Sequence, residues 1–241
     1  MTELFFWNKY KPKTLDEIHH NGRSILLLKQ MSKSTNMSHL YITGMTTTYT
    51  ALVANLFVKC ISGVENLKLK KVKFVLSPSI TVDIQSSEYH YEFDMNYYKY
   101  MRRDIPLLII NNIVRHKNIS NNSYNIIIIQ NANLMTYNVQ AAFRRLMEKN
   151  ISSCRFILIS KNGNGIMEAL RSRCVSIYFI KPQFSTYRSI LDKISVNEGI
   201  DIDERVYEDI YELSTGIIDG INLLQLYSLN KDAIEYKKKY S

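Results

Sequence analysis

The chain has 241 residues, a net charge of +9 at pH 7, and 46% hydrophobic residues. This composition supplies a real core and excludes a chain that is disordered throughout, and the length suits one large domain or one domain with a small companion. The positive charge favours a polyanionic partner, most often nucleic acid; the alternative is a basic surface that only faces water.

Cysteine and histidine usage argues against a metal site. Cys60, Cys154 and Cys174 form no Cys-x-x-Cys pair, and the five histidines show no ligand spacing. We therefore expect no disulfide framework, no bound metal and a reducing compartment. The N-terminus does not read as a secretory signal, and no apolar run approaches the roughly 18 residues of a membrane span. The expected location is intracellular, nuclear for a cellular protein or a cytoplasmic replication site for a viral one, without a membrane partner.

The first half of the chain alternates strands and helices. An extended arm leads into a helix near residues 23–33. The hydrophobic pattern then predicts, in order, a strand at 40–43, a helix at 51–61, strands at 71–77 and 89–95, and a helix at 105–116.

The second half continues this alternation and then changes. The stretch "YNIIIIQNAN" at 124–133 has four consecutive isoleucines, which indicate a strand covered on both faces, as in a parallel sheet. A helix at 135–150 and strands at 155–160 and 174–180 follow. Beyond Pro182 only helices are predicted, with Gly216 as a helix stop and a frayed C-terminus. We therefore expect an α/β domain at 1–180 and a small helical domain at 181–241.

Four segments, in order, resemble the replication factor C small subunits, the clamp-loader branch of the AAA+ family. They are "FFWNKYKPKTLDEI", "EYHYEFDM", "VQAAFRRLMEKNISSCRFIL" and "ALRSRC", and the second is most similar to the stator-type subunit. The resemblance implies a parallel AAA+ (P-loop-type) sheet with flanking helices, followed by an all-helical lid. The family also carries a collar domain, and we expect that domain to be absent because the chain stops after the lid.

The loop that follows the first strand differs from the family's phosphate loop, G-x-x-x-x-G-K-[ST]. Counting from Gly44, the positions of the second glycine, the lysine and the hydroxyl residue are Tyr49, Thr50 and Ala51. A phosphate loop needs glycines for close backbone approach and a lysine for the outer phosphates. Only Gly44 matches this pattern.

Other elements of the nucleotide site also differ. Gln130 and Asn131 stand where the family has an acidic pair that holds Mg²⁺, and Mg²⁺ prefers carboxylates. Lys161, followed by Asn162, replaces the sensing asparagine, and Ile218 replaces the arginine of the lid. These differences predict a degenerate AAA+ ATPase, a pseudo-enzyme that binds neither ATP nor Mg²⁺ tightly as a cofactor.

Arg173, in Ser172-Arg173-Cys174, matches the family's arginine finger, which reaches the γ-phosphate bound by a neighbouring subunit. The alternative is a structural arginine at a strand edge. Two arginine pairs, Arg102-Arg103 and Arg144-Arg145, are candidates for contact with nucleic acid or a neighbouring subunit, or else belong to solvated surfaces.

The resemblance implies an ATPase-inactive clamp-loader subunit. Its partners would be other AAA+ or clamp-loader subunits, a sliding clamp and primer–template DNA. The alternative is a non-catalytic adaptor of a replication or transcription complex, cellular or viral.

Overall fold

The computed structural model describes residues 5–34, 36–44, 46–77, 80–98, 105–115, 124–161 and 163–240. The chain divides into two compact units: an α/β unit, Leu26–Phe179, and a helical unit, Met1–Ile25 together with Ile180–Ser241. The boundary between the two units, near residue 180, coincides with the change from alternating strands and helices to helices alone. The N-terminal arm groups with the helical unit, whereas the sequence-based boundary placed it in the α/β domain.

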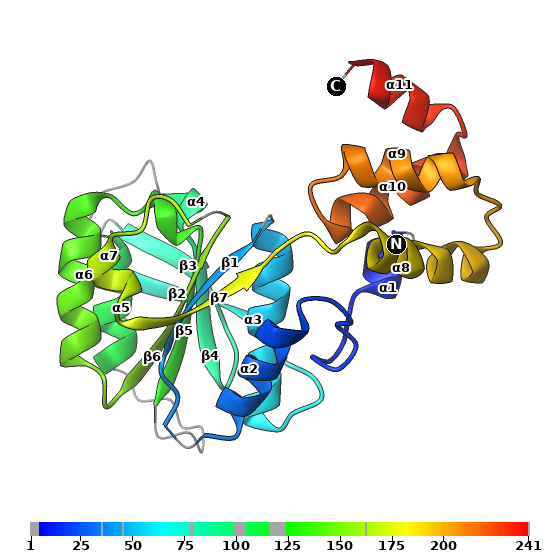
Figure 1. The fold of residues 1–241 in the computed structure, drawn as a ribbon. Coiled ribbons are helices and arrows are strands. Elements are labelled where there is room, and N and C mark those ends of the chain that lie inside the picture. The colour runs from blue at the N-terminus through cyan, green and yellow to red at the C-terminus, as the bar shows by residue number, and fades with distance from the viewer. Residues whose placement is uncertain are drawn as a thin grey trace. The chain divides into compact units, whose positions relative to one another are not determined.

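The α/β unit is built on one seven-stranded sheet with the order β2-β3-β4-β5-β6-β1-β7 (Figure 1). The four pairings from β4 to β7 are parallel, and β2–β3 and β3–β4 are antiparallel. The strands are β1 (His39–Gly44), β2 (Lys70–Ser77), β3 (Ile80–Ser86), β4 (His90–Asp94), β5 (Asn125–Gln130), β6 (Cys154–Ser160) and β7 (Cys174–Phe179). The predicted fold class, a mostly parallel sheet with flanking helices and a helical C-terminal part, is confirmed.

The isoleucine run forms the centre of this sheet. Ile126, Ile127, Ile128 and Ile129 of β5 have no exposed surface, because β4 and β6 flank the strand and helices cover both faces. A strand buried on both faces has no polar side to alternate with, which explains the continuous apolar run.

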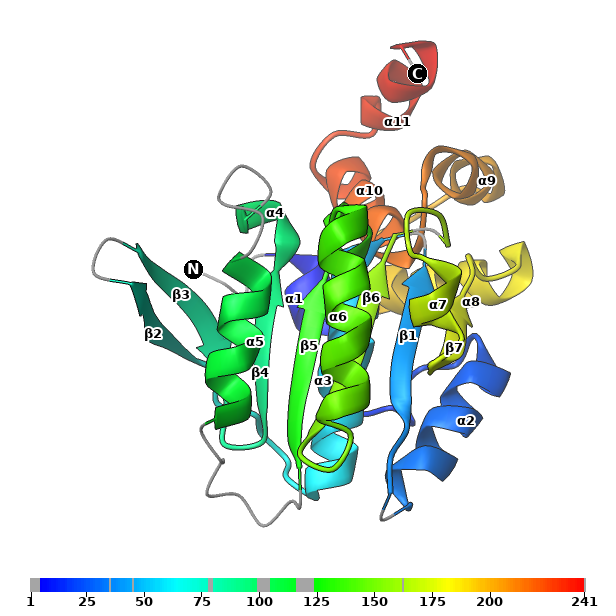
Figure 2. The same ribbon diagram turned by 90° about the vertical axis from the view of Figure 1, so that its left-hand side faces the viewer.

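Helices cover the two faces of the sheet (Figures 1 and 2). On one face α3 packs against β1, β5 and β6, and on the other α5 packs against β2 and α6 against β6. The helices of the first 179 residues are α1 (Phe6–Tyr10), α2 (Gly22–Ser32), α3 (Thr47–Ser62), α4 (Met95–Tyr98), α5 (Ile105–Arg115), α6 (Tyr137–Lys149) and α7 (Glu168–Arg171), with a 3₁₀ turn η2 (Ala132–Leu134).

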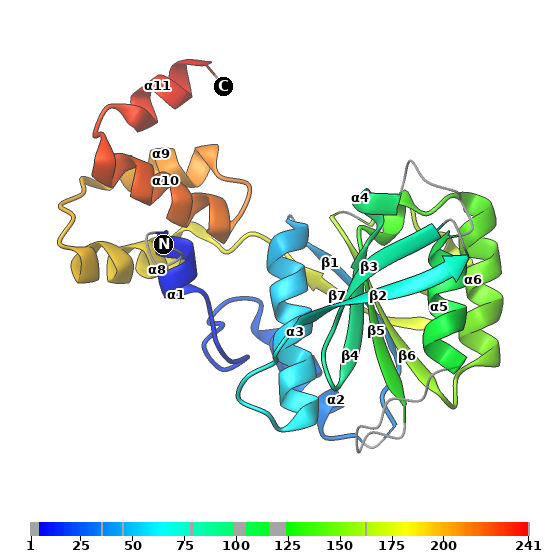
Figure 3. The same ribbon diagram turned by 180° about the vertical axis from the view of Figure 1, so that it is seen from behind.

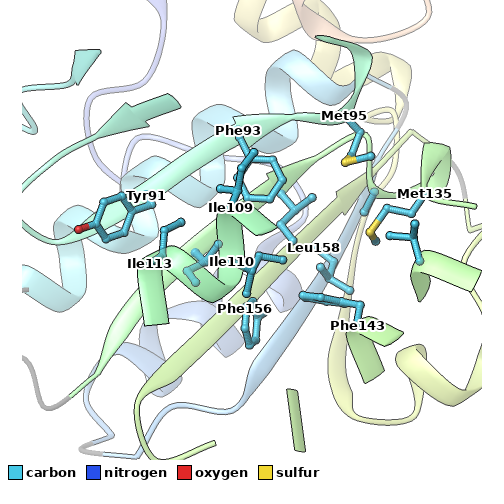
Figure 4. Packing of buried hydrophobic residues seen from close by; sticks show 14 of the residues in the cluster. Tyr91, Phe93, Met95, Ile109, Ile110, Ile113, Met135, Phe143, Phe156 and Leu158 are labelled. Carbon is cyan, nitrogen blue, oxygen red and sulfur yellow. The ribbon is translucent and has the colours of Figure 1, made fainter. Parts of the chain in front are cut away.

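A hydrophobic core lies between α5, α6 and the sheet (Figure 4). Phe143 of α6 and Phe156 of β6 have no exposed surface, and their rings meet edge to face with centroids 4.9 Å apart. Ile109, Ile110 and Ile113 of α5 complete this layer. Edge-to-face aromatic pairs stabilise a core beyond the area that they bury.

Strand β3 was missing from the sequence-based prediction. It pairs with β2 in an antiparallel hairpin at the edge of the sheet, which faces the viewer in Figure 3. Val82, Ile84 and Ser86 are buried and alternate with exposed residues. The period-two pattern was therefore present in the sequence, although polar residues dilute it.

The helical unit combines the N-terminal arm with four helices. These are α8 (Phe184–Glu198), α9 (Glu204–Leu213), α10 (Ile217–Leu229) and α11 (Ala233–Tyr240). The arm contains the short helix α1, which packs against α10, and Tyr10 donates a 2.5 Å hydrogen bond to Glu198. The arm was expected to be extended, but it is helical at Phe6–Tyr10.

Two details of the helical unit differ from the expectation. Gly216 does not stop a helix; α9 ends at Leu213, and Gly216 is the N-cap of α10. The C-terminal segment forms α11, in which Lys238 pairs with Asp209, where fraying was expected. Within the described ranges, none of the helices has the length and apolar character needed to cross a bilayer.

Candidate functional site

The loop after β1 is packed into the α/β unit. A Cβ atom added at Gly44 would lie 2.6 Å from Thr50 Cγ2 and 3.2 Å from the backbone oxygen of Phe179. The close approach of β7 and of the first turns of α3 therefore favours glycine at this position, whatever the loop binds.

The next positions lie in the first turns of α3, and their side chains are buried. Tyr49 is 7% exposed and its ring meets that of Phe179, with centroids 6.1 Å apart. Burial raises the pKa of the Tyr49 hydroxyl, so it stays neutral. Thr50 has no exposed surface and donates a 3.2 Å hydrogen bond to the backbone oxygen of Thr46, and Ala51 is buried beside it. What this segment offers a phosphate is backbone N–H groups at the start of α3, without a lysine ammonium.

The end of β5 places amides beside carboxylates from the neighbouring strand. Gln130 donates a hydrogen bond to Glu92, and Asn131 Nδ2 lies 2.7 Å from Asp94 Oδ1. Asn131 has φ 51°, a left-handed conformation that asparagine tolerates better than most residues. Carboxyl groups are therefore present at this strand end, but β4 supplies them and not β5.

Glu92 belongs to a buried polar cluster that the sequence reading missed. It is 3% exposed, and its carboxylate accepts a 3.3 Å hydrogen bond from Asn55 of α3 and lies 3.7 Å from His90 Nε2. His90 is fully buried, and its Nδ1 lies 2.7 Å from Ser87 Oγ. A glutamate inside a predicted strand was the available signal, since carboxylates are rarely buried without partners. Over the described ranges, no three His, Cys, Asp or Glu side chains gather as metal ligands.

Arg173 follows α7 and directly precedes β7. Its Nε donates a 2.8 Å hydrogen bond to Glu148 Oε1, its Nη2 contacts the same oxygen, and its Nη1 donates a 2.5 Å hydrogen bond to the backbone oxygen of Ala169. The side chain remains 34% exposed. The arginine is therefore at the surface, with an ion-pair partner on α6.

A shallow hollow of about 480 Å³ adjoins Arg173. Its lining also includes Ser38, Ser152 and Arg155, and contains no carboxylate. Arg155 is 7% exposed and donates to the backbone oxygens of Met37 and Ile151 and, over 2.6 Å, to Asn36 Oδ1. Its guanidinium stacks on Tyr124 with 4.6 Å to the ring centroid. This buried cation fixes the loop before β1 and leaves the hollow electropositive.

The other predicted residues belong to several different elements. Arg144 and Arg145 are on α6; Arg145 is exposed, and Arg144 Nε lies 3.9 Å from Glu148 Oε1. Lys161 is exposed after β6, and Ile218 is buried in α10. Arg102, Arg103 and Asn162 lie outside the described residues.

The surroundings of Cys174 and Gln140 indicate structural roles for both residues. Burial raises the pKa of the Cys174 thiol to about 12, which keeps it in the unreactive protonated form. Gln140 of α6, which the sequence reading did not single out, is 3% exposed and bonds three backbone groups. Its amide donates to the oxygens of Met135 and Gly165 at 2.9 and 2.7 Å and accepts from Met167 N at 2.7 Å. It thereby ties α6 to the segment that leads into α7.

Comparisons with known proteins agree with this architecture. The chain matches no family profile. It is 30% identical over 226 residues to a replication factor C small subunit of Staphylothermus marinus, which covers 93% of the chain and 62% of that protein. It is 27% identical over 239 residues to replication factor C subunit 5 of Saccharomyces cerevisiae, which covers 92% of the chain and 66% of that protein. Over more than nine tenths of its length, the chain is similar to replication factor C small subunits.

A solved structure has the same fold as this chain. The Thermotoga maritima RuvB Holliday junction branch migration motor superposes with a TM-score of 0.65 at 11% identity, over 95% of this chain and 72% of that one. The chain spans about three fifths of the length of the first relatives it matches.

The similarity to replication factor C small subunits corrects two expectations. The chain was expected to be a pseudo-enzyme without a cofactor, but its relatives are replication factor C small subunits, a family of AAA+ ATPases that bind ATP with Mg²⁺, and no comparison marks it as degenerate. The expectation was based on single positions compared with a motif. Such a comparison does not include the carboxylates of Glu92 and Asp94, which β4 places beside Gln130 and Asn131.

Proposed function

We propose that the chain acts as a clamp-loader subunit in DNA replication and contributes Arg173 to a nucleotide bound by a neighbouring subunit. The observation that carries this proposal is the position of Arg173. It lies in the Ser-Arg-Cys motif before β7, one third exposed, beside a hollow without carboxylates. A guanidinium placed at an oxyanion stabilises the charge that develops in phosphoryl transfer.

The expected partners follow from this role. They are other replication factor C subunits or related AAA+ chains, a sliding clamp and primer–template DNA, and the location would be intracellular. Residues 1–180 would form the AAA+ domain and residues 181–241 the lid. Arg144 and Arg145 of α6 are the described candidates for contact with DNA or a neighbouring subunit, because Arg145 is exposed and Arg144 is only loosely paired.

Affinity purification from the native source tests this function. We expect the tagged chain to recover at least one further AAA+ subunit, and the recovered complex to place a sliding clamp on primed DNA in the presence of Mg-ATP. A preparation depleted of this chain should lose the loading activity. Recovery of a complex with neither an AAA+ subunit nor a clamp would contradict the proposal.

The net charge of +9 predicts binding to DNA without sequence preference and with strong salt dependence. The slope of log K against log salt measures the number of neutralised phosphates, at about 0.9 for each contact in duplex DNA. Replacing both Arg144 and Arg145 by Gln should therefore reduce the slope by about 2. Fluorescence anisotropy with primed DNA would measure this slope. Replacing Lys237 and Lys239 of α11 by Gln removes the same charge at another surface. An equal reduction of the salt slope in that variant would contradict a specific contact between α6 and DNA.

A further inference from the structure

The Arg173 guanidinium is held in one orientation by groups from two elements. One carboxylate oxygen of Glu148 in α6 accepts a hydrogen bond from Nε and also contacts Nη2. The backbone carbonyl of Ala169 in α7 accepts a hydrogen bond from Nη1. An arginine offers five N–H groups in a planar fork, so these contacts use three of them. One N–H remains on each of Nη1 and Nη2, and no further partner is found for them in the described part of the chain.

The two remaining N–H groups suit an oxyanion. Nη1 and Nη2 are the terminal nitrogens of the fork, and each keeps one N–H that can donate to an oxygen of a phosphate or carboxylate. The hollow beside Arg173 has no carboxylate in its lining that would repel an anion, and Ser38, Ser152 and Arg155 contribute hydroxyl groups and a positive charge.

We propose that Glu148 is a positioning residue that holds Arg173 with its terminal N–H groups directed to a phosphate of the neighbouring subunit's nucleotide. This inference rests on the proposed function of Arg173. A long flexible side chain that must be ordered during the reaction loses rotational freedom at that step. Glu148 and Ala169 order the Arg173 side chain before the nucleotide reacts. Its rotational entropy is therefore already reduced in the free chain and is not lost during the reaction.

The ion pair itself should contribute little to stability. The side chain of Glu148 is 46% exposed and that of Arg173 34%, and exposed pairs are screened by water and salt. Glu148→Gln should therefore leave the fold and its thermal midpoint almost unchanged. An unchanged thermal midpoint in Glu148→Gln would distinguish a role in positioning Arg173 from a role in folding.

The first measurement uses the purified chain and nitrogen-15 NMR of arginine Nε–H groups. The Arg173 signal is identified by its loss in Arg173→Lys. We expect its Nε–H to exchange with water at least about tenfold faster in Glu148→Gln, because the hydrogen bond to the carboxylate weakens. Glu168→Gln is the matched control, since it removes one carboxylate from α7 and should leave the Arg173 signal as in the wild type. Equal exchange in wild type and Glu148→Gln would overturn the inference.

The second measurement uses the complex recovered with its AAA+ partner and Mg-ATP. Glu148→Gln should lower kcat for ATP at least about fivefold with little change in KM, because it disturbs the orientation of a group and not the binding of the nucleotide. The double variant Glu148→Gln/Arg173→Ala should be no slower than Arg173→Ala alone, since Glu148 acts through Arg173.

The outcomes distinguish this inference from the proposed function. If Arg173→Ala slows ATP turnover but Glu148→Gln does not, or accelerates it, Arg173 keeps its role and the inference is overturned. An additive loss in the double variant would also overturn it. Unchanged turnover in Arg173→Ala would overturn the proposed function itself, and the positioning role with it.

Discussion

Arg173→Ala is expected to lower ATP turnover of the assembled complex at least about tenfold, since a single well-placed cation stabilises a phosphoryl-transfer transition state by several kcal/mol. The side chain is one third exposed and its partners are Glu148 and a backbone carbonyl. Its truncation should therefore leave the chain folded and the complex assembled. Steady-state kinetics with Mg-ATP, together with gel filtration of the complex, measure both parts of this expectation.

Two companion variants test whether the effect depends on the guanidinium. Arg173→Lys keeps the charge but lacks the planar fork, so it should restore little of the lost turnover. Arg171→Ala is the control, because Arg171 is also exposed and lies two residues away in α7. Equal losses in Arg171→Ala and Arg173→Ala would indicate a general effect of positive charge on the interface. Full turnover in Arg173→Ala would exclude a finger at this position.

Much of the architecture could be predicted because it depends on local patterns. The isoleucine run at 126–129 predicted a strand buried on both faces, and that strand lies inside the sheet between β4 and β6. The apolar face of the helix at 135–150 predicted a helix that packs on the sheet, and Phe143 is fully buried there. Hydrophobic periodicity reports which side of an element is covered, and these elements have one clear answer.

The site was harder to predict because its partners come from distant parts of the chain. Asp94 reaches Asn131 across 37 positions, and Glu148 reaches Arg173 across 25. A motif compares residues at fixed spacing along one element, so it cannot report a carboxylate that a neighbouring strand supplies. The interpretation of Gln130 and Asn131 therefore considered β5 alone and left out the carboxylates of β4. Gly216 was misplaced by a related ambiguity, since glycine occurs at both ends of helices.

The same reasoning about close packing predicts a large effect at Gly220 of α10. A Cβ atom at this position would lie 1.7 Å from Tyr187 Oη and 2.5 Å from Tyr187 Cζ. Tyr187 of α8 cannot easily move away. It has no exposed surface, its hydroxyl donates a 2.6 Å hydrogen bond to Ser214 Oγ, and its ring meets Tyr211 edge to face at 5.0 Å.

Gly220→Ala should therefore destabilise the helical unit by about 3 kcal/mol, because overpacking forces either the Tyr187 ring or α10 out of position. In an open helix the same change would stabilise by roughly 1 kcal/mol, since alanine is the better helix former. Urea unfolding followed by circular dichroism measures the difference. Gly22→Ala in α2 is the matched control, because a Cβ there meets nothing within 4 Å, and it should be neutral or slightly stabilising. Tyr187→Leu in the Gly220→Ala background should recover part of the loss by removing the atoms that clash. If Gly220→Ala is as stable as the wild type, the Tyr187 ring does not occupy the space above Gly220, and the packing of α8 on α10 described here is wrong.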